Sequence, residues 1–220
     1  SLVEHYDAVA IAGHSEYWTI TQHDTLRQHL KRGGHLLSMS GNTAYWRVSI
    51  DASNQVMEVR KHDHRQMPGV NCHPMLFSAH HHQMDHLPGS CMRYAGYPES
   101  ALLGLVTGGF TDPPLGGPRA GYRVLRPEHA LFHHPHRIDT TEPFANDAAG
   151  YETDCSIRLL LQRYGPSKAP MYPAADGSPR PTLDGDFDRH ITILARAAIP
   201  HSDCLDYDVN FFKGDMHSDI

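Results

Sequence analysis

The chain opens with two short apolar runs separated by a helical pattern. Residues 7–12 (DAVAIA) and 35–39 (HLLSM) are short and mostly apolar, which is typical of buried strands in a parallel sheet. Between them, residues 21–31 carry leucines four positions apart among polar residues, the period of an amphipathic helix. Gly33 and Gly34 follow, and glycine accepts the left-handed conformation that ends many helices. The opening therefore predicts a strand–helix–strand unit.

A cluster of polar and aromatic residues follows each of these predicted strands. The first cluster reads HSEYW from residue 14, and the second reads GNTAYWR from residue 41. In an open parallel sheet, ligands bind outside the carboxyl ends of neighbouring strands, which share one edge. A Tyr-Trp pair recurs in both clusters, so we expect Tyr17 and Tyr45 to lie at the same edge. One such pair alone is typical of aromatic packing, whereas both together favour a site.

Regular patterns become sparse after residue 48. Val56, Met57 and Val59 alternate with polar residues, which predicts a hairpin arm. Residues 65–89 form a long irregular segment with three prolines and several histidines. A loop of that length inside a compact domain is usually functional or disordered. We therefore predict an irregular, His-rich insertion over about residues 53–90.

Further elements are predicted along the second half of the chain. Apolar runs predict strands at residues 101–106, 122–124 and 190–199, with Glu99 as a surface residue just before the first of them. Glu152 lies two positions before Asp154, so on an extended segment both carboxylates point to the same side.

Composition narrows the class of protein. At 220 residues the chain is long enough for one domain with a substantial core, and we predict a single α/β domain over residues 1–220. The net charge of −6 and the pI near 6.3 give no electrostatic reason to expect nucleic acid or an anionic membrane as partner. Four scattered cysteines without a CxxC pair favour free thiols and a cytoplasmic setting, with one or two disulfides as the alternative.

Histidine is unusually frequent. The chain has 19 histidines, with runs at residues 80–82, with His86 close by, and at residues 133–136. Histidine is the commonest metal-binding side chain, although such runs are also typical of solvated loops.

Three motifs carry a resemblance to a known family. GHSEYWT, GGHLLSMSGNTAYWRV and AAGYETD resemble the C-terminal domain of the N,N-dimethylformamidase large (beta) subunit family. The resemblance implies a glutamine-amidotransferase-like or flavodoxin-like α/β fold: a three-layer sandwich around a mostly parallel sheet, here with long irregular loop insertions. It also implies further strands before Ser1 and after Ile220. We therefore expect a fragment of a longer polypeptide, or a chain that assembles into an oligomer.

The sequence argues against glutamine-amidotransferase chemistry itself. That mechanism needs a cysteine nucleophile on a sharp strand-to-helix turn, and this chain has Ser40-Gly41-Asn42 at the corresponding place. A serine nucleophile at Ser40 is a minor alternative.

The resemblance implies instead the hydrolysis of a small amide at one iron ion, held by two tyrosinates and a carboxylate. Carried over to this chain, the tyrosines are Tyr17 and Tyr45. Phenolate is a hard anionic donor, which suits ferric iron. The third ligand is a glutamate in the family, and the corresponding segment here offers Asp85 or His86. If His86 binds, zinc becomes the main alternative to iron.

Other residues are assigned around this metal. Glu152 is the candidate general base, because a carboxylate is needed to take a proton from water. Asn42 is a candidate for hydrogen bonding to the substrate carbonyl, with a turn-forming role as the alternative. His82 is a further candidate catalytic residue, and His14 and Glu16 are candidates for orienting Tyr17.

Two functions of different class follow from the sequence. The first is a metal-dependent hydrolase that cleaves the C–N bond of a small-molecule amide. The alternative is a non-catalytic α/β module whose His-rich loops bind metal or a partner chain.

Overall fold

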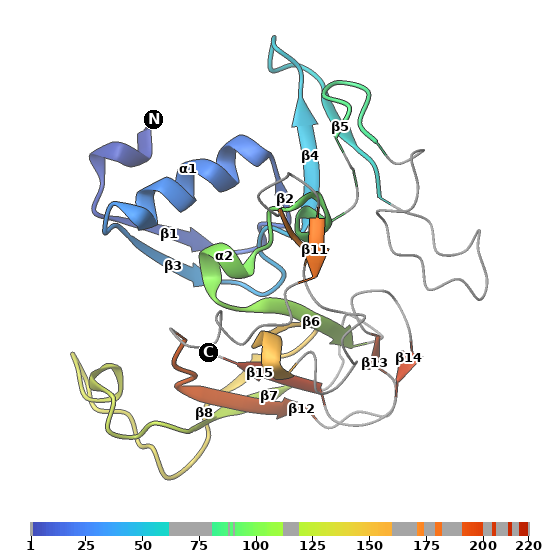
Figure 1. The fold of residues 1–220 in the computed structure, drawn as a ribbon. Helices are drawn as coiled ribbons and strands as arrows, with labels where there is room; N and C mark the ends of the chain where they lie inside the picture. The colour runs from blue at the N-terminus through green and yellow to red at the C-terminus, as the bar shows by residue number, and fades with distance from the viewer. Residues whose placement is uncertain are drawn as a thin grey trace. The chain divides into compact units, whose positions relative to one another are not determined.

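The computed structural model describes residues 2–61, 81–87, 89, 91–111, 119–159, 171–173, 179–181, 191–199, 204–205, 211–212 and 216–219. The chain divides into two compact units (Figure 1). The first unit comprises residues 1–104 and 164–184, and the second comprises residues 105–163 and 185–220.

The first unit contains the predicted strand–helix–strand arrangement. Its elements are η1 (Leu2–His5), β1 (Ala8–Ala12), β2 (Tyr17–Trp18), α1 (Ile20–Lys31), β3 (His35–Met39), β4 (Trp46–Ile50), β5 (Met57–Val59), η5 (Met92–Ala95), α2 (Ser100–Leu103), β10 (Met171–Pro173) and β11 (Pro179–Pro181). β1 pairs in parallel with β3, and β2 pairs in parallel with β4. β5 pairs antiparallel with β4, which confirms the predicted hairpin arm. β10 and β11 form a separate antiparallel pair.

Local signals explain where α1 begins and ends. The Thr19 hydroxyl accepts the N–H of Gln22 at 3.1 Å, and the Gln22 side chain accepts the N–H of Thr19 at 2.8 Å. This reciprocal capping box fixes the first turn. At the other end the N–H groups of Gly33 and Gly34 donate to the carbonyls of Leu30 and His29, and Gly33 has φ +89°. This C-terminal cap requires the left-handed conformation that glycine adopts without steric cost.

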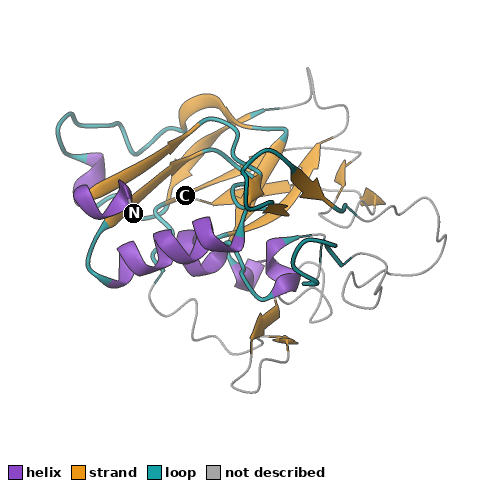
Figure 2. Ribbon diagram, turned by 90° about the horizontal axis from the view of Figure 1, so that it is seen from above, coloured by secondary structure: helices purple, strands orange, loops and turns teal. Residues whose placement is uncertain are grey.

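Among the described residues, strands β1 and β3 are covered on one face. Val9, Ile11 and Leu36 pack against the core cluster beside α1, which runs along the pair (Figure 2). Their neighbours along the strands point the other way, and the side chains of Leu37 and Met39 are 56% and 58% exposed. The prediction of buried strands is therefore wrong: in both strands half-buried residues alternate with exposed ones, because within the described residues α1 covers a single side of the pair.

The core of the first unit joins both strand–helix segments. Trp18, Leu26, Ala44, Met92 and Leu102 form one buried cluster. These residues come from β2, α1, the loop before β4, η5 and α2. Packing of this cluster therefore fixes the two sequence motifs around Tyr17 and Tyr45 relative to each other.

The predicted strand over residues 101–106 is wrong at its start. Residues 100–103 form the short helix α2, and the strand β6 begins at Val106. Gly104 ends the helix with φ +74° and donates its N–H to the carbonyl of Ser100. Gly104 thus separates helix α2 from strand β6, which the apolar pattern alone had merged into one predicted strand.

The second unit is built from antiparallel sheets. Its elements are β6 (Val106–Thr111), β7 (Ala120–Val124), η6 (Ala130–Phe132), β8 (Phe144–Ala149), β9 (Glu152–Cys155), β12 (Ala195–Ile199), β13 (Cys204–Leu205), β14 (Phe211–Phe212) and β15 (Met216–Asp219). One sheet has the order β15-β12-β7-β8, and the other has the order β14-β13-β6-β9. Ala149, Ala197 and Ile199 form a buried cluster with Ala120 and Tyr122 packed against it. The predicted strand at 122–124 corresponds to β7, and the predicted strand at 190–199 is confirmed only over Ala195–Ile199, because residues 191–194 have no regular structure.

The structure confirms a mixed α/β protein but not a mostly parallel sheet. Among the described strands, only β1–β3 and β2–β4 pair in parallel, and every other pairing is antiparallel. Parallel neighbours need a crossover of a dozen or more residues, and α1 is the one described helix of that length. The three-layer sandwich stays a prediction. No helix in the described part of the chain combines the length and apolar character needed to cross a membrane.

Candidate functional site

The two Tyr-Trp motifs lie side by side in the first unit, as predicted. Parallel pairing resumes beyond the ends of β1 and β3, where Tyr17 is the register partner of Trp46. The N–H of Ala44 donates to the carbonyl of Ser15 at 2.9 Å, and the N–H of Trp46 donates to that of Glu16 at 2.7 Å. These backbone bonds bring the two polar clusters together at one edge.

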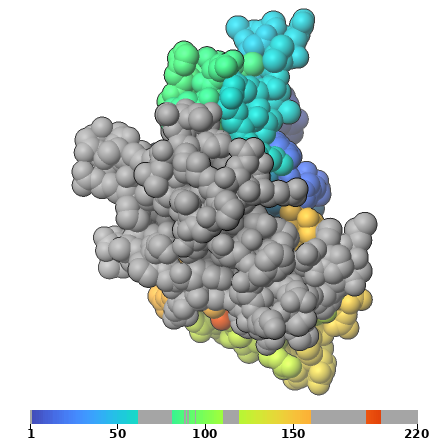
Figure 3. Space-filling view, turned by 90° about the vertical axis from the view of Figure 1, so that its right-hand side faces the viewer, coloured from blue at the N-terminus to red at the C-terminus, as the bar shows by residue number. Residues whose placement is uncertain are grey.

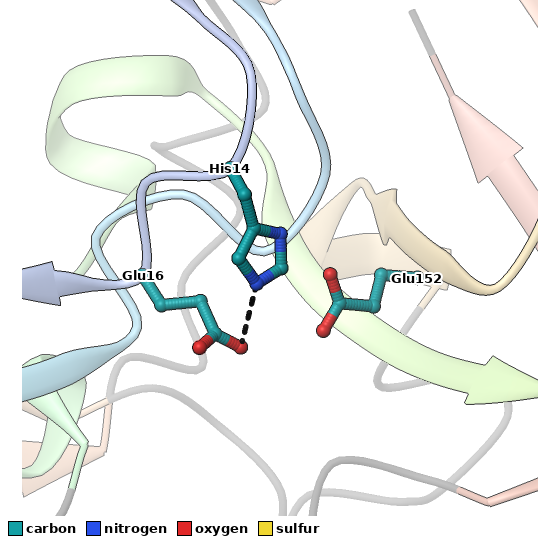
Figure 4. A group of neighbouring side chains, drawn as sticks. All are labelled: His14, Glu16 and Glu152. Carbon is teal, nitrogen blue, oxygen red and sulfur yellow. Dashed lines mark ion pairs between the residues drawn. The ribbon is translucent and has the colours of Figure 1, made fainter. Parts of the chain in front are cut away.

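Glu16 is held by a residue from the second cluster. The side-chain amide of Asn42 donates to Oε1 of Glu16 at 2.6 Å, and Nε2 of His14 lies 3.4 Å from the same oxygen (Figure 4). The Glu16 side chain is 13% exposed, whereas that of His14 is 57% exposed. Asn42 is buried and has φ +57°, a conformation that asparagine tolerates better than most residues. Asn42 therefore both adopts the backbone conformation that the turn needs and donates a hydrogen bond to the Glu16 carboxylate.

Tyr17 presents its phenol to a lysine. Nζ of Lys61 donates to the Tyr17 hydroxyl and lies 4.7 Å from the ring centroid of Tyr17 and 4.8 Å from that of Trp46. A cation over aromatic faces is attracted by the ring quadrupoles. Tyr17 is 41% exposed, and Lys61 is the cation that contacts its hydroxyl among the described residues.

Tyr45 lies in a different environment, buried to 6% exposure. Its ring packs edge-on against Trp46 at 4.8 Å between centroids, and the guanidinium of Arg93 lies 5.5 Å from its centroid. Arg93 is itself buried and forms an ion pair with Glu99. The prediction of Glu99 as a surface residue is wrong, because Glu99 is 1% exposed. Its carboxylate neutralises the charge of the Arg93 guanidinium that lies against the Tyr45 ring.

The Arg93–Glu99 pair gives a stability prediction. Glu99→Gln leaves the buried Arg93 charge without its carboxylate, and we expect the free energy of unfolding to fall by about 3–5 kcal/mol. The double variant Arg93→Met/Glu99→Gln removes the arginine charge as well and should recover part of that loss. Urea unfolding measures both. A loss below about 1 kcal/mol for Glu99→Gln would contradict the account of this pair.

The turn that carries the candidate third ligand packs on the β4–β5 arm. Asp85 pairs with the buried guanidinium of Arg47, whose Nη1 also donates to the Leu87 carbonyl at 3.5 Å. On β5, the Glu58 carboxylate accepts the N–H groups of Gln83 and Met84 at 2.9 and 3.1 Å. Figure 3 shows residues of this turn, in green, beside the cyan arm.

His82 and His86 occupy opposite environments in this turn. His82 is fully buried, and its Nδ1 lies 2.6 Å from the Ser49 hydroxyl. Burial, followed by the nearby Arg47 charge, lowers the pKa of His82. His86 is exposed with φ +58° and donates its N–H to the His82 carbonyl at 3.0 Å. In this arrangement His82 holds the turn in place, whereas His86 faces solvent.

Glu58 makes the attachment of the turn dependent on pH. The N–H of Gln83, together with Arg60, lowers the pKa of Glu58 to about 2. A carboxyl group whose pKa is lower in the folded state stabilises the fold above its unfolded pKa. That stabilisation is lost as the pH falls from about 4.5 toward 2.

We therefore expect Glu58→Gln to lower the free energy of unfolding most at neutral pH. The difference from the parent protein should narrow as the pH falls through this window. Urea unfolding across the acid range measures it, and Glu142→Gln, at an exposed position, gives the effect of removing a surface charge. A difference that stays constant with pH would contradict the role of Glu58.

Glu152, the candidate general base, belongs to the second unit and is the third residue labelled in Figure 4. It begins β9, where Glu152 and Asp154 are half-buried and Thr153 and Cys155 are buried. The two carboxylates therefore share one side of the strand, as their spacing predicted. Phe110 on β6 is the register partner of Glu152.

The donor chemistry of the first unit fits the hard cation that the sequence predicts. Tyr17, Tyr45 and Asp85 offer two phenol oxygens and a carboxylate, the donor types that ferric iron accepts. Lys61 and Arg47 already contact the oxygens of Tyr17 and Asp85, so a metal ion bound there would have to displace these two cations or share the oxygens with them. Among the described residues, no close group of three His, Cys, Asp or Glu side chains includes His133, His134 or His136.

The first unit is an α/β module with a polar site where its paired parallel strands meet. Aromatic residues and carboxylates at the ends of these strands make up the site. The family model for N,N-dimethylformamidase beta subunit-like, C-terminal, matches residues 1–200. The chain belongs to this family, which confirms the resemblance drawn from the three motifs. No match was found among curated proteins.

Several residues of the site were missed by the sequence reading. Lys61, Arg47 and Glu58 had no assigned role, although Arg47 directly follows the second Tyr-Trp pair. Each is a charged residue in or beside a strand of alternating pattern, where a solvated position is the usual expectation. Burial of Arg47 at 1% exposure is a tertiary effect that the local pattern does not indicate.

Proposed function

We propose that the protein is a metal-dependent hydrolase that cleaves the C–N bond of a small amide. The observation that carries the proposal is the family match over residues 1–200, which includes both Tyr-Trp motifs and the AAGYETD motif. The adjacency of Tyr17 and Trp46 in the first unit supports it, because the two motifs contribute to one edge.

In this proposal Tyr17, Tyr45 and Asp85 hold ferric iron, with His86 as the alternative third ligand and zinc as the alternative metal. The metal would supply Lewis acidity, which polarises the amide carbonyl and makes water a stronger nucleophile. Glu152 takes the proton from the attacking water and returns it to the leaving amine. Glu16, fixed by Asn42, sits beside Tyr17 in sequence and orients the motif that presents its phenol.

Metal content and colour test the metal ligands directly. The purified protein should contain nearly stoichiometric iron and show a visible band from charge transfer between tyrosinate and ferric iron. Tyr17→Phe and Tyr45→Phe should each weaken or abolish the band, because each removes a phenol oxygen. Tyr6→Phe is the matched control, since Tyr6 is an exposed tyrosine outside both motifs. Elemental analysis and visible absorption provide the measurements.

The outcomes separate the two candidate functions. Zinc that is retained in both tyrosine variants, or no bound metal, would contradict the iron site. That result would favour the alternative of a non-catalytic module that binds metal or a partner chain through its His-rich loops.

A further inference from the structure

Lys61 places its ammonium group at the edge where the two Tyr-Trp motifs meet. Its Nζ donates to the Tyr17 hydroxyl and lies 4.7 Å from the ring centroid of Tyr17 and 4.8 Å from that of Trp46. Tyr17 on β2 is the register partner of Trp46 on β4, so the two rings come from neighbouring parallel strands. One cation therefore contacts both motifs.

The chain around Lys61 is held by the sheet that carries both motifs. Lys61 follows β5 by two residues, and Nε of the neighbouring Arg60 donates to the Glu58 carboxylate on β5 at 2.6 Å. Strand β5 pairs with β4, which pairs in turn with β2. Ordering a lysine side chain costs conformational entropy. Two ring contacts and a charge-assisted hydrogen bond offset that cost here.

The contacts of Lys61 with the two rings do not use the phenol oxygen. The ring quadrupoles of Tyr17 and Trp46 attract the ammonium whether or not that oxygen has a further partner. A phenol oxygen also has more than one lone-pair direction, so an accepted N–H leaves room for another contact on the same atom. Lys61 can therefore stay beside Tyr17 while the oxygen binds a metal ion.

We propose that Lys61 is a positioning residue for Tyr17, which holds the phenol oxygen in place and shares it with the metal ion instead of being displaced. This inference rests on the proposed function, in which Tyr17 is a ligand of ferric iron. The tyrosinate charge lies between the two cations and offsets their mutual repulsion. A tyrosinate that accepts an N–H from Lys61 gives part of its electron density to that hydrogen bond, so it is a weaker donor to the metal.

Visible absorption of the iron-loaded protein tests this role. Charge transfer to ferric iron needs more energy from a weaker donor, so the band of Lys61→Met should move to longer wavelength than that of the parent protein. Methionine keeps most of the side-chain length and removes the ammonium. Lys61→Arg keeps a cation that donates to oxygen and stacks on aromatic rings, so it should return the band toward its parent position.

The matched control is Lys31→Met, because Lys31 is exposed at the end of α1 in the same unit. This variant should leave the band at its parent position. Each variant is loaded to the same iron content, which elemental analysis verifies, and thermal unfolding verifies that each is folded.

The outcomes distinguish this inference from the proposed function. A shift to longer wavelength in Lys61→Met that Lys61→Arg reverses and Lys31→Met lacks would support the positioning role. A band that stays in place or moves to shorter wavelength in Lys61→Met would overturn this inference alone and leave the iron site intact. Equal shifts in Lys61→Met and Lys31→Met would also overturn it. A parent protein without the band would contradict the proposed iron site and this inference together.

Discussion

The parallel backbone pairing of β2 with β4 is the constraint on which the candidate site of the first unit depends. Two hydrogen bonds, from Ala44 to Ser15 and from Trp46 to Glu16, join loops that are separated by α1 in the sequence. Trp18 and Ala44, on either side of this junction, are buried in the same cluster as Leu26 of α1. Burial of that cluster and the caps of α1 stabilise the junction together, so side chains as small as Asn42 reach across it to Glu16.

Three positively charged residues contact the candidate ligand residues near this junction. Lys61 contacts Tyr17, Arg93 lies against Tyr45, and Arg47 pairs with Asp85 on the neighbouring turn. Arg47 and Arg93 have fully buried side chains, and removing one partner of such a pair is costly because the remaining charge stays desolvated. These pairs therefore fix the positions of the candidate ligand residues. They also imply that a bound cation has to compete with, or be compensated by, the existing positive charges.

The sequence predicted the parts of the fold that follow from local pattern. Helix α1, strands β1 and β3, the β4–β5 arm and the meeting of the two Tyr-Trp motifs were all predicted, because apolar period, glycine caps and strand-end geometry are local signals. The antiparallel sheets of the second unit were not predicted, since short strands with irregular loops carry no signal of pairing direction. The pairing of Arg93 with Glu99 and of Arg47 with Asp85 depends on tertiary contacts. Of the predicted His-rich insertion over about residues 53–90, residues 62–80, 88 and 90 lie outside the described residues.

The assay that tests the central claim most directly is hydrolysis of a small amide by the purified, iron-loaded protein. The account predicts that amine and carboxylate are released in equal amounts, and that Glu152→Gln loses activity while retaining iron and its visible band. Glu142→Gln, which removes an exposed carboxylate from the same unit, should remain active. Iron-loaded protein that releases no amine from any small amide would contradict the account, as would a Glu152→Gln variant with full activity.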